Sequence, residues 1–299
     1  MKVLHHTDAD GWCVAYWVSK RFNNNNPEDF IMIDYGIDID WFSKIKKDEK
    51  VIIVDFSIEP DMMRKLLIRT KDVIWIDHHK SAIEKYNDFE SEIPGLRYDG
   101  IAASVLSYCY FFEMKDGKLE FDPKNMPIKA PWFTKYIGDH DVWRYEFGEE
   151  TAHWKLGFDA MGTMLPTDKR WNDLYDIEKV KDIISNGSVI EKYRDAMGKK
   201  ACELYGFEYN FDEYKAFCLN NCFGGSEWFG NLINKYDLVC TFLYVAENDS
   251  WEYSLYTNKE YVDVSKIASN YPDKLSGGGH KKAAGIQTKK FIFNKKVLV

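Results

Sequence analysis

The fold of the chain is decided by the stretch Val73-Ile74-Trp75-Ile76-Asp77-His78-His79-Lys80. Its first four residues are β-branched or aromatic and are too few for a helix, so they predict a buried strand. An acid and two imidazoles follow at once. Because open α/β folds bind their ligands at the carboxyl edge of the parallel sheet, the stretch predicts a binding site at that edge. Taken alone, this stretch would be weak evidence for a metal site, since histidines at strand ends commonly bond backbone carbonyls.

Two other short apolar segments end in the same way. Residues 51–54 precede Asp55, and residues 3–4 precede the polar stretch from His5 to Gly11. Three short strands that end at acids or imidazoles predict a metal cluster at one edge of a sheet. Carboxylate and imidazole ligands without thiolate are typical of Mn²⁺, Mg²⁺ or a similar ion, rather than of structural zinc.

The spacing of the acids indicates how they would share the site. Asp8 and Asp10 are two residues apart, so in an extended strand end both carboxylates face one side, with His6 on the same face. Asp55, on a neighbouring strand, is placed to bridge two ions. The expected set is completed by His78 and a carboxylate from residues 138–143. Two ions about 3.5–4 Å apart polarise a phosphoryl oxygen and activate water for in-line attack.

Composition and charge exclude several classes of protein. A length of 299 residues is sufficient for two domains, and a hydrophobic content of 45% excludes a disordered chain. The net charge of −8 argues against a protein that binds long nucleic acid, but it allows a small anionic substrate held by a metal. The six scattered cysteines contain no CxxC pair, which favours reduced thiols. With no signal segment and no membrane-length apolar run, we expect a soluble, cytoplasmic protein.

Strand and helix signals alternate through the first half of the chain, which predicts a parallel sheet with right-handed crossovers. Polar helical patterns follow, with Gly187 among their breaks, and strand patterns return near the C-terminus. The predicted fold class is α/β, with an N-terminal parallel-sheet domain (1–150), a helical connector (151–205) and a smaller C-terminal α/β domain with a mixed sheet (206–299). We also expect loops at 116–117 and 123–131, and a short helix over 132–137 that breaks at Gly138.

Five stretches resemble, in order, the motifs of the DHH phosphoesterase superfamily. They are His6-Thr7-Asp8-Ala9-Asp10-Gly11, Asp55, Asp77-His78-His79, Gly138-Asp139 and Gly277-Gly278-Gly279-His280-Lys281-Lys282-Ala283-Ala284-Gly285. The last resembles the signature of the DHH-associated C-terminal domain. Each motif alone is modest in specificity, whereas five in the family's order, from the first strand nearly to the end, are strong. The spacing and the stretch 139–143 look most similar to the oligoribonuclease (nanoRNase) and linear-dinucleotide phosphodiesterase branch.

The resemblance implies a two-metal centre with Mn²⁺, or Mg²⁺ as the alternative. One ion would be held by His6, Asp8 and Asp55. The other would be held by Asp10, Asp55, His78 and Asp139, so that Asp55 bridges the two. Asp77 would orient a histidine ligand, and His79 would face the substrate phosphate.

The C-terminal signature implies a substrate site. His280, with Gly278 and Gly279 before it, would bind the substrate's phosphate or terminal nucleotide across a cleft between the domains. The residue types agree with this role, because successive glycines expose backbone N–H groups to an anion and Lys281 and Lys282 add charge. A flexible tip is the alternative interpretation of the glycine run.

Two positions leave alternatives open. Family members often carry an arginine, which can clamp a phosphate, at the position where this chain has Tyr256. Tyr256 would either contact the phosphate in place of that arginine or stack on a base of the substrate. Asp139 and Asp141 compete for the fourth motif. We favour Asp139, because it directly follows the apolar-then-small approach 136–138, and Asp141 would then be an outer acid.

The resemblance predicts a metal-dependent phosphodiesterase that hydrolyses short oligonucleotides or linear dinucleotides to mononucleotides, with Asp55 and His79 as catalytic residues. The expected partner is this short substrate, with no long duplex and no membrane, and a homodimer is compatible with the sequence. Three alternatives remain: a RecJ-like single-strand exonuclease, a pyrophosphatase of the same metal chemistry, and a non-catalytic nucleotide-binding regulator. They are disfavoured, respectively, by the acidic charge balance, the glycine-histidine signature and the complete ligand set.

Overall fold

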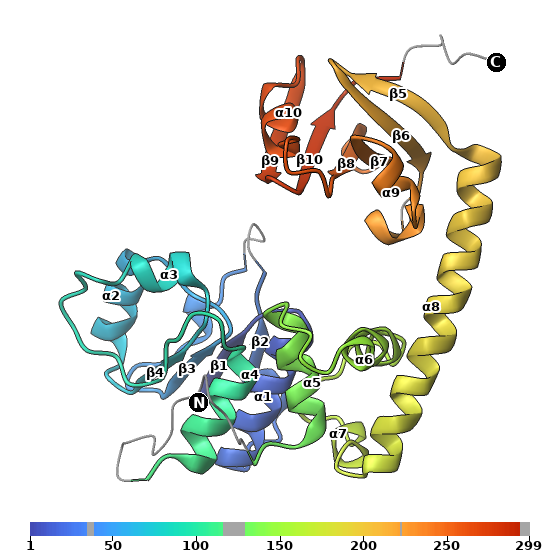
Figure 1. Cartoon of the computed structure of the whole chain (residues 1–299). Coiled ribbons are helices and arrows are strands. Elements are labelled where there is room, and N and C mark those ends of the chain that lie inside the picture. Colours follow the sequence, from blue (N-terminus) through green and yellow to red (C-terminus); the bar gives the residue numbers. More distant parts are fainter. Residues whose placement is uncertain (35–38, 116–128, 222, 294–299) are drawn as a thin grey trace. The chain divides into compact units, whose positions relative to one another are not determined.

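The computed structural model describes residues 1–34, 39–115, 129–221 and 223–293. The chain divides into two compact units, Met1–Ile190 and Glu191–Val299 (Figure 1). The three-part division expected from the sequence stays a prediction. Among the described residues, no helix combines the length and the apolar content needed to cross a membrane. The loops expected at 116–117 and 123–131 lie outside the described residues, except for 129–131.

The first unit is built on a parallel sheet of four short strands. They are β1 (Lys2–His5), β2 (Phe30–Met32), β3 (Val51–Val54) and β4 (Val73–Ile76), in the order β2-β1-β3-β4. The register pairs His5 with Val54 and Val54 with Ile76, so β1, β3 and β4 end side by side. The residues that follow these strands therefore meet at one edge, as the sequence predicted.

Both faces of this sheet are covered by helices. Alternate strand residues point to opposite sides, and the residues on each side are apolar and buried. Leu4, Ile53 and Trp75 pack with Met63 and Leu66 of α2 (Pro60–Arg69). Residues of the opposite parity, such as Ile52 and Val54, pack with α1 (Ala9–Phe22) and α4 (Ala103–Tyr108), which continues as a π-helical turn over Cys109–Glu113. Short helices complete the unit at the edges: η1 (Pro27–Asp29), η2 (Phe42–Lys44) and α3 (Lys80–Glu84).

A helical layer packs against α1. It consists of α5 (Trp132–Asp141), α6 (Glu149–Asp159), α7 (Arg170–Asp173) and the first part of α8 (Ile177–Tyr205). Side chains of α6, α7 and α8, among them Trp154, Trp171 and Val180, share one buried cluster with Tyr16 and Phe133. Residues that the sequence placed in a connector thus contribute to the core of the first unit.

The helix predicted to break at Gly138 continues to Asp141, so that prediction is wrong. A Cβ at Gly138 would lie 2.9 Å from Val105 Cγ2 and 3.2 Å from the Ala102 Cβ. Glycine is therefore present because α5 packs closely on α4. Its intrinsic cost within a helix is only about 1 kcal/mol, which such packing offsets.

The second unit contains a mixed six-stranded sheet in the order β5-β6-β7-β8-β10-β9. Its strands are β5 (Phe207–Phe211), β6 (Tyr214–Asn220), β7 (Leu238–Val245), β8 (Ser250–Tyr256), β9 (Lys274–His280) and β10 (Ala283–Thr288). Only β6 and β7 pair in parallel. The accompanying helices are η5 (Ser226–Phe229), α9 (Leu232–Lys235) and α10 (Val264–Asn270). The predicted fold class, a parallel-sheet domain followed by a smaller mixed-sheet domain, is confirmed.

Candidate metal centre

Asp55 lies at the middle of the centre, at the carboxyl end of β3. It is 1% exposed, and its backbone is left-handed with φ of 51°. This conformation is rare outside glycine, asparagine and aspartate, and such strain is concentrated at functional sites. The Asp55 N–H still bonds Ile76 O at 3.0 Å, so the residue is anchored to β4.

The first group of possible ligands is His6, Asp8 and Asp55, which offer ligand atoms within 4.8 Å of one another. His6 Nδ1 lies 2.8 Å from Asp8 Oδ2 and 3.9 Å from Asp55 Oδ2. Asp8 is the N-cap of α1, and its Oδ1 accepts from Gly11 N at 2.9 Å. Burial opposes ionisation of Asp8, but the His6 and Gly11 hydrogen bonds outweigh it and lower its pKa to about 2.

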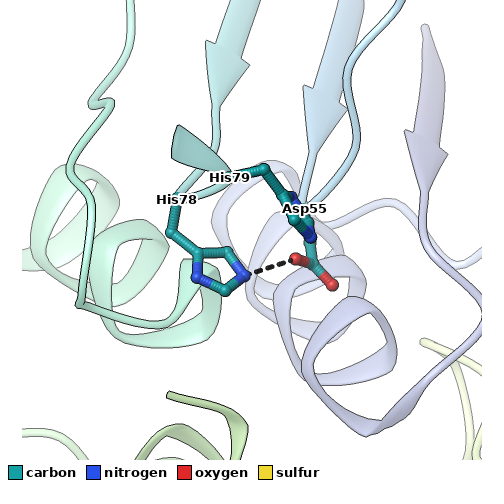
Figure 2. A group of neighbouring side chains, drawn as sticks. All are labelled: Asp55, His78 and His79. Atoms are coloured by element: carbon teal, nitrogen blue, oxygen red, sulfur yellow. Dashed lines mark ion pairs between the residues drawn. The ribbon is translucent and has the colours of Figure 1, made fainter. Parts of the chain in front are cut away.

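The second group is Asp10, His78 and Asp141. His78 Nε2 lies 3.2 Å from Asp55 Oδ1 and 3.3 Å from Asp141 Oδ2, so this ring joins the second group to Asp55. Figure 2 shows the His78 ring pointing at the Asp55 carboxylate. Asp10 is buried, and its Oδ1 accepts from Ser104 N at 3.1 Å.

The strand-period argument for Asp8 and Asp10 is wrong, although both residues do reach the centre. β1 ends at His5, and the chain turns directly into α1. Asp8 is the cap and Asp10 lies in the first turn, where the positive end of the helix dipole stabilises acids. A Cβ at Gly11 would lie 2.4 Å from His6 O, so only glycine permits this close turn.

The structure brings Asp141, and not Asp139, into the centre, contrary to the preference drawn from the sequence. Asp139 Oδ1 accepts from Glu146 N at 2.9 Å, and Asp139 Oδ2 accepts from Phe147 N and from the Thr151 hydroxyl. Asp139 therefore fixes the segment that follows α5. Asp141, the last residue of α5, takes the place beside His78.

Asp77 orients a histidine, but that histidine is His79. Asp77 Oδ1 accepts from His78 N at 2.7 Å, from His79 N at 3.2 Å and from His79 Nδ1 at 2.7 Å. The side-chain bond to Asp77 raises the pKa of His79. The rings of His78 and His79 are 4.5 Å apart, and both, with Asp55, form a further possible ligand group. His79 thus lies beside the centre, while its role toward the substrate phosphate stays a prediction.

The electrostatics of the centre fit a divalent cation pair. Three carboxylates of the centre have raised pKa values, first because they are buried and then because acidic neighbours repel their negative charge. The pKa is raised to about 7 for Asp10, to about 9 for Asp141, and well above the usual range for Asp55. Asp55 Oδ2 and Asp141 Oδ2 are buried and accept no hydrogen bond from the described part of the chain. Bound cations would remove the repulsion and satisfy both oxygens.

Sequence reasoning missed one neighbour of the centre, Asp34. Its Oδ1 lies 3.4 Å from His6 Nε2, and its Oδ2 accepts from the Thr7 hydroxyl at 3.4 Å. A signal was present, because Asp34 closely follows β2 at the same edge of the sheet. With β2, all four strands of this sheet are followed closely by an acid.

The predicted substrate residues of the second unit lie on β8 and β9, the two strands that flank β10. Ala283 pairs with both His280 and Tyr256, so these two residues occupy one row across β9, β10 and β8. Gly278 and Gly279 belong to β9, an edge strand, rather than to a flexible tip. Lys281 and Lys282 both form ion pairs with Glu260, at 3.4 and 2.7 Å, so one glutamate balances half of the positive charge expected from them.

No family model matches the chain. It is 27% identical over 218 residues to oligoribonuclease NrnB of Bacillus subtilis, covering 70% of this chain and 51% of that protein. It is 23% identical over 261 residues to an uncharacterized protein of Acanthamoeba polyphaga mimivirus, covering 83% and 55%. The chain thus spans about half the length of these curated relatives. A pGpG-specific phosphodiesterase, PggH of Vibrio cholerae, shares the fold with a TM-score of 0.52 and 11% identity, over 96% of this chain and 92% of that one.

Proposed function

We propose, on the premise that this chain belongs to the DHH phosphoesterase superfamily, that it is a metal-dependent phosphodiesterase for short oligonucleotides or linear dinucleotides. The similarity to NrnB supports the superfamily predicted from the motifs, and the fold shared with PggH agrees with it. The activity, the substrate and the metal are proposals, supported by the geometry of the centre.

One observation carries the proposal. Two groups of three possible ligands, His6/Asp8/Asp55 and Asp10/His78/Asp141, meet where His78 Nε2 lies 3.2 Å from the buried carboxylate of Asp55. Oxygen and nitrogen ligands without sulfur suit Mn²⁺, with Mg²⁺ as the alternative. We assign the first group to one ion and the second group to the other, with Asp55 shared between them.

Two bound cations would supply Lewis-acid activation of the phosphoryl group and of the attacking water. The chain's own residues then have separable tasks. Asp55 holds the two ligand groups in register through β3 and its contact with His78. His79, oriented and kept basic by Asp77, is placed to donate a hydrogen bond to the substrate phosphate or to transfer a proton there.

The short substrate follows from charge. Long strands are bound mainly through phosphate neutralisation, which needs a run of lysines and arginines. This chain carries 48 acidic against 40 basic residues, and Lys281 and Lys282 are paired with Glu260. The row containing His280 and Tyr256 offers one site for a phosphate or a base. NrnB and PggH, by their names, act on an oligoribonucleotide and on pGpG respectively.

The test is hydrolysis of 5′-labelled oligonucleotides of two to thirty units by the purified full chain, with Mn²⁺, with Mg²⁺ and with EDTA. We expect metal-dependent release of mononucleotides, fastest from the shortest substrates. Preferential degradation of long single strands would favour the RecJ-like exonuclease. Binding of nucleotides without any turnover in either metal would favour the regulator.

A further inference from the structure

The C-terminal end of α5 forms a Schellman motif whose key position is occupied by tryptophan. Val142 is the C-cap. Trp143 N donates to His140 O at 3.0 Å, and Arg144 N donates to Asp139 O at 3.0 Å, which are the two bonds of the motif. The residue after the C-cap must be left-handed, and here it is Trp143, with φ of 55°.

Tryptophan is a poor choice for this position on backbone grounds. Glycine is the usual residue because a Cβ clashes in the left-handed region, and a bulky side chain there is an outlier. Tyr145, two residues on, is also left-handed, with φ of 52°. Burial does not compensate for the cost at Trp143, because its side chain is 75% exposed. Strain without a packing return is a feature of functional positions.

The exposed indole is linked to the candidate metal centre through its neighbour His140. Trp143 is two residues after Asp141, and its ring is 5.8 Å from the His140 ring and 5.9 Å from the Tyr145 ring. His140 and Asp141 in turn line a cavity of about 110 Å³, together with Asp10 and Lys155. The indole thus lies beside a ring, that of His140, which lines a cavity together with two acids of the centre, Asp10 and Asp141.

We propose that Trp143 is the stacking platform for a nucleobase of the substrate, next to the phosphodiester held at the centre. This inference rests on the proposed function and adds to it the residue that recognises the nucleoside. A large rigid ring presented to solvent matches the flat face of any base, so the contact accepts purines and pyrimidines alike. The left-handed backbone fixes the direction in which the ring leaves the helix end.

Trp143→Gly is the sharpest variant, because glycine is the preferred residue at this backbone position. A structural role for the indole predicts a lower melting temperature, whereas the stacking role predicts a melting temperature at or above that of the wild type with weaker nucleotide binding. Trp143→Phe retains a ring and should recover part of the binding. Trp132→Ala is the matched control, since Trp132 is a partly exposed tryptophan at the other end of the same helix.

The binding measurement uses a mononucleotide of 2-aminopurine, which cannot be cleaved and whose fluorescence falls when the base stacks. With Mn²⁺ present, we expect quenching by the wild type and by Trp132→Ala. We expect binding about 5- to 150-fold weaker for Trp143→Gly, the range given by removal of one base–aromatic contact. Equal affinity and equal quenching in Trp143→Gly would overturn the proposal.

A kinetic measurement separates this proposal from the proposed function. For each variant, kcat/KM is measured on a dinucleotide and on its analogue with one base removed. The ratio of the two values should fall in Trp143→Gly, mainly through KM, and stay unchanged in Trp132→Ala. If the wild type cleaves the dinucleotide and the ratio of the two kcat/KM values is the same in all variants, the stacking proposal is refuted and the proposed function stands. Absence of cleavage by the wild type refutes the proposed function, while the 2-aminopurine titration still decides on stacking.

Discussion

Exchanging the two acids at the end of α5 for asparagine, one at a time, should separate a structural acid from a metal ligand. Asp139 accepts hydrogen bonds from Glu146 N, Phe147 N and the Thr151 hydroxyl. In Asp139→Asn one oxygen can keep the bond to Glu146. The amide NH₂ cannot accept from Phe147 N–H, whereas the Thr151 hydroxyl can rotate to accept from the amide. Losing one hydrogen bond to a charged acceptor costs about 2 kcal/mol. For a unit of this size, that corresponds to a melting temperature lower by about 4–8 °C.

Asp141→Asn should have the opposite profile. Asp141 lies near Asp8 and Asp10, and burial and their charges raise its pKa to about 9. Removing this carboxylate relieves repulsion in the metal-free protein, so its melting temperature in EDTA should not fall. The same change removes a ligand beside His78, so bound metal should fall from about two ions per chain toward one, and turnover should fall at least about 100-fold.

The assay measures three quantities on both variants: the melting temperature in EDTA, the bound manganese by elemental analysis after gel filtration, and kcat on a dinucleotide. The two variants act as controls for each other, since they make the same chemical change two residues apart. Loss of metal from Asp139→Asn, with full metal content in Asp141→Asn, would refute the assignment of Asp141.

Three further predictions concern the bridge, the second unit and the substrate. Asp55→Asn keeps the shape but removes the shared charge, so we expect turnover to fall by about 1,000-fold with the circular dichroism spectrum unchanged; near-normal turnover in saturating Mn²⁺ would rule out bridging. His280→Ala should raise KM or lower kcat while elemental analysis still finds about two ions per chain, and a loss of metal would show that His280 serves the metal instead. In competition between a labelled dinucleotide and an unlabelled long single strand, the substrates of about two to five units should have the higher kcat/KM, because the chain lacks the basic run that a long strand needs; an equal or better value for the long strand contradicts this.

The parallel sheet and the location of the centre could be predicted from the sequence because short buried strands carry a direct signal. Four-residue apolar runs such as Val73–Ile76 are too short for a helix, and parallel strands bring their carboxyl ends to one edge. The residues after them, Asp55 and Asp77-His78-His79, therefore had to meet. Asp34 obeys the same rule after β2, but its signal is weaker, because Ile33 separates it from the strand end.

Glycines were the main source of error in the helices. Gly138 and Gly187 were interpreted as breaks, because glycine weakens an isolated helix. In the structure both lie inside helices, where a Cβ would come within 2.9 Å of Val105 Cγ2 and within 1.7 Å of His153 O, respectively. They mark close approaches of α5 to α4 and of α8 to α6. Such approaches depend on tertiary packing, which one sequence does not contain.

The remaining error, Asp139 for Asp141, follows from the same missed helix and shows why so much function is concentrated at its end. In a strand, residues two apart share a face, whereas in a helix they are about 200° apart around the axis. Once α5 extends to Asp141, only one of the two acids can face the centre, and the other must bond elsewhere, as Asp139 does with Glu146 N. The helix ends just beyond Asp141 in a Schellman motif, and that motif places a left-handed residue, Trp143, after the C-cap. The sequence therefore places a structural acid, the proposed metal ligand and an exposed indole within five residues, 139–143, because one helix terminus sets all three directions.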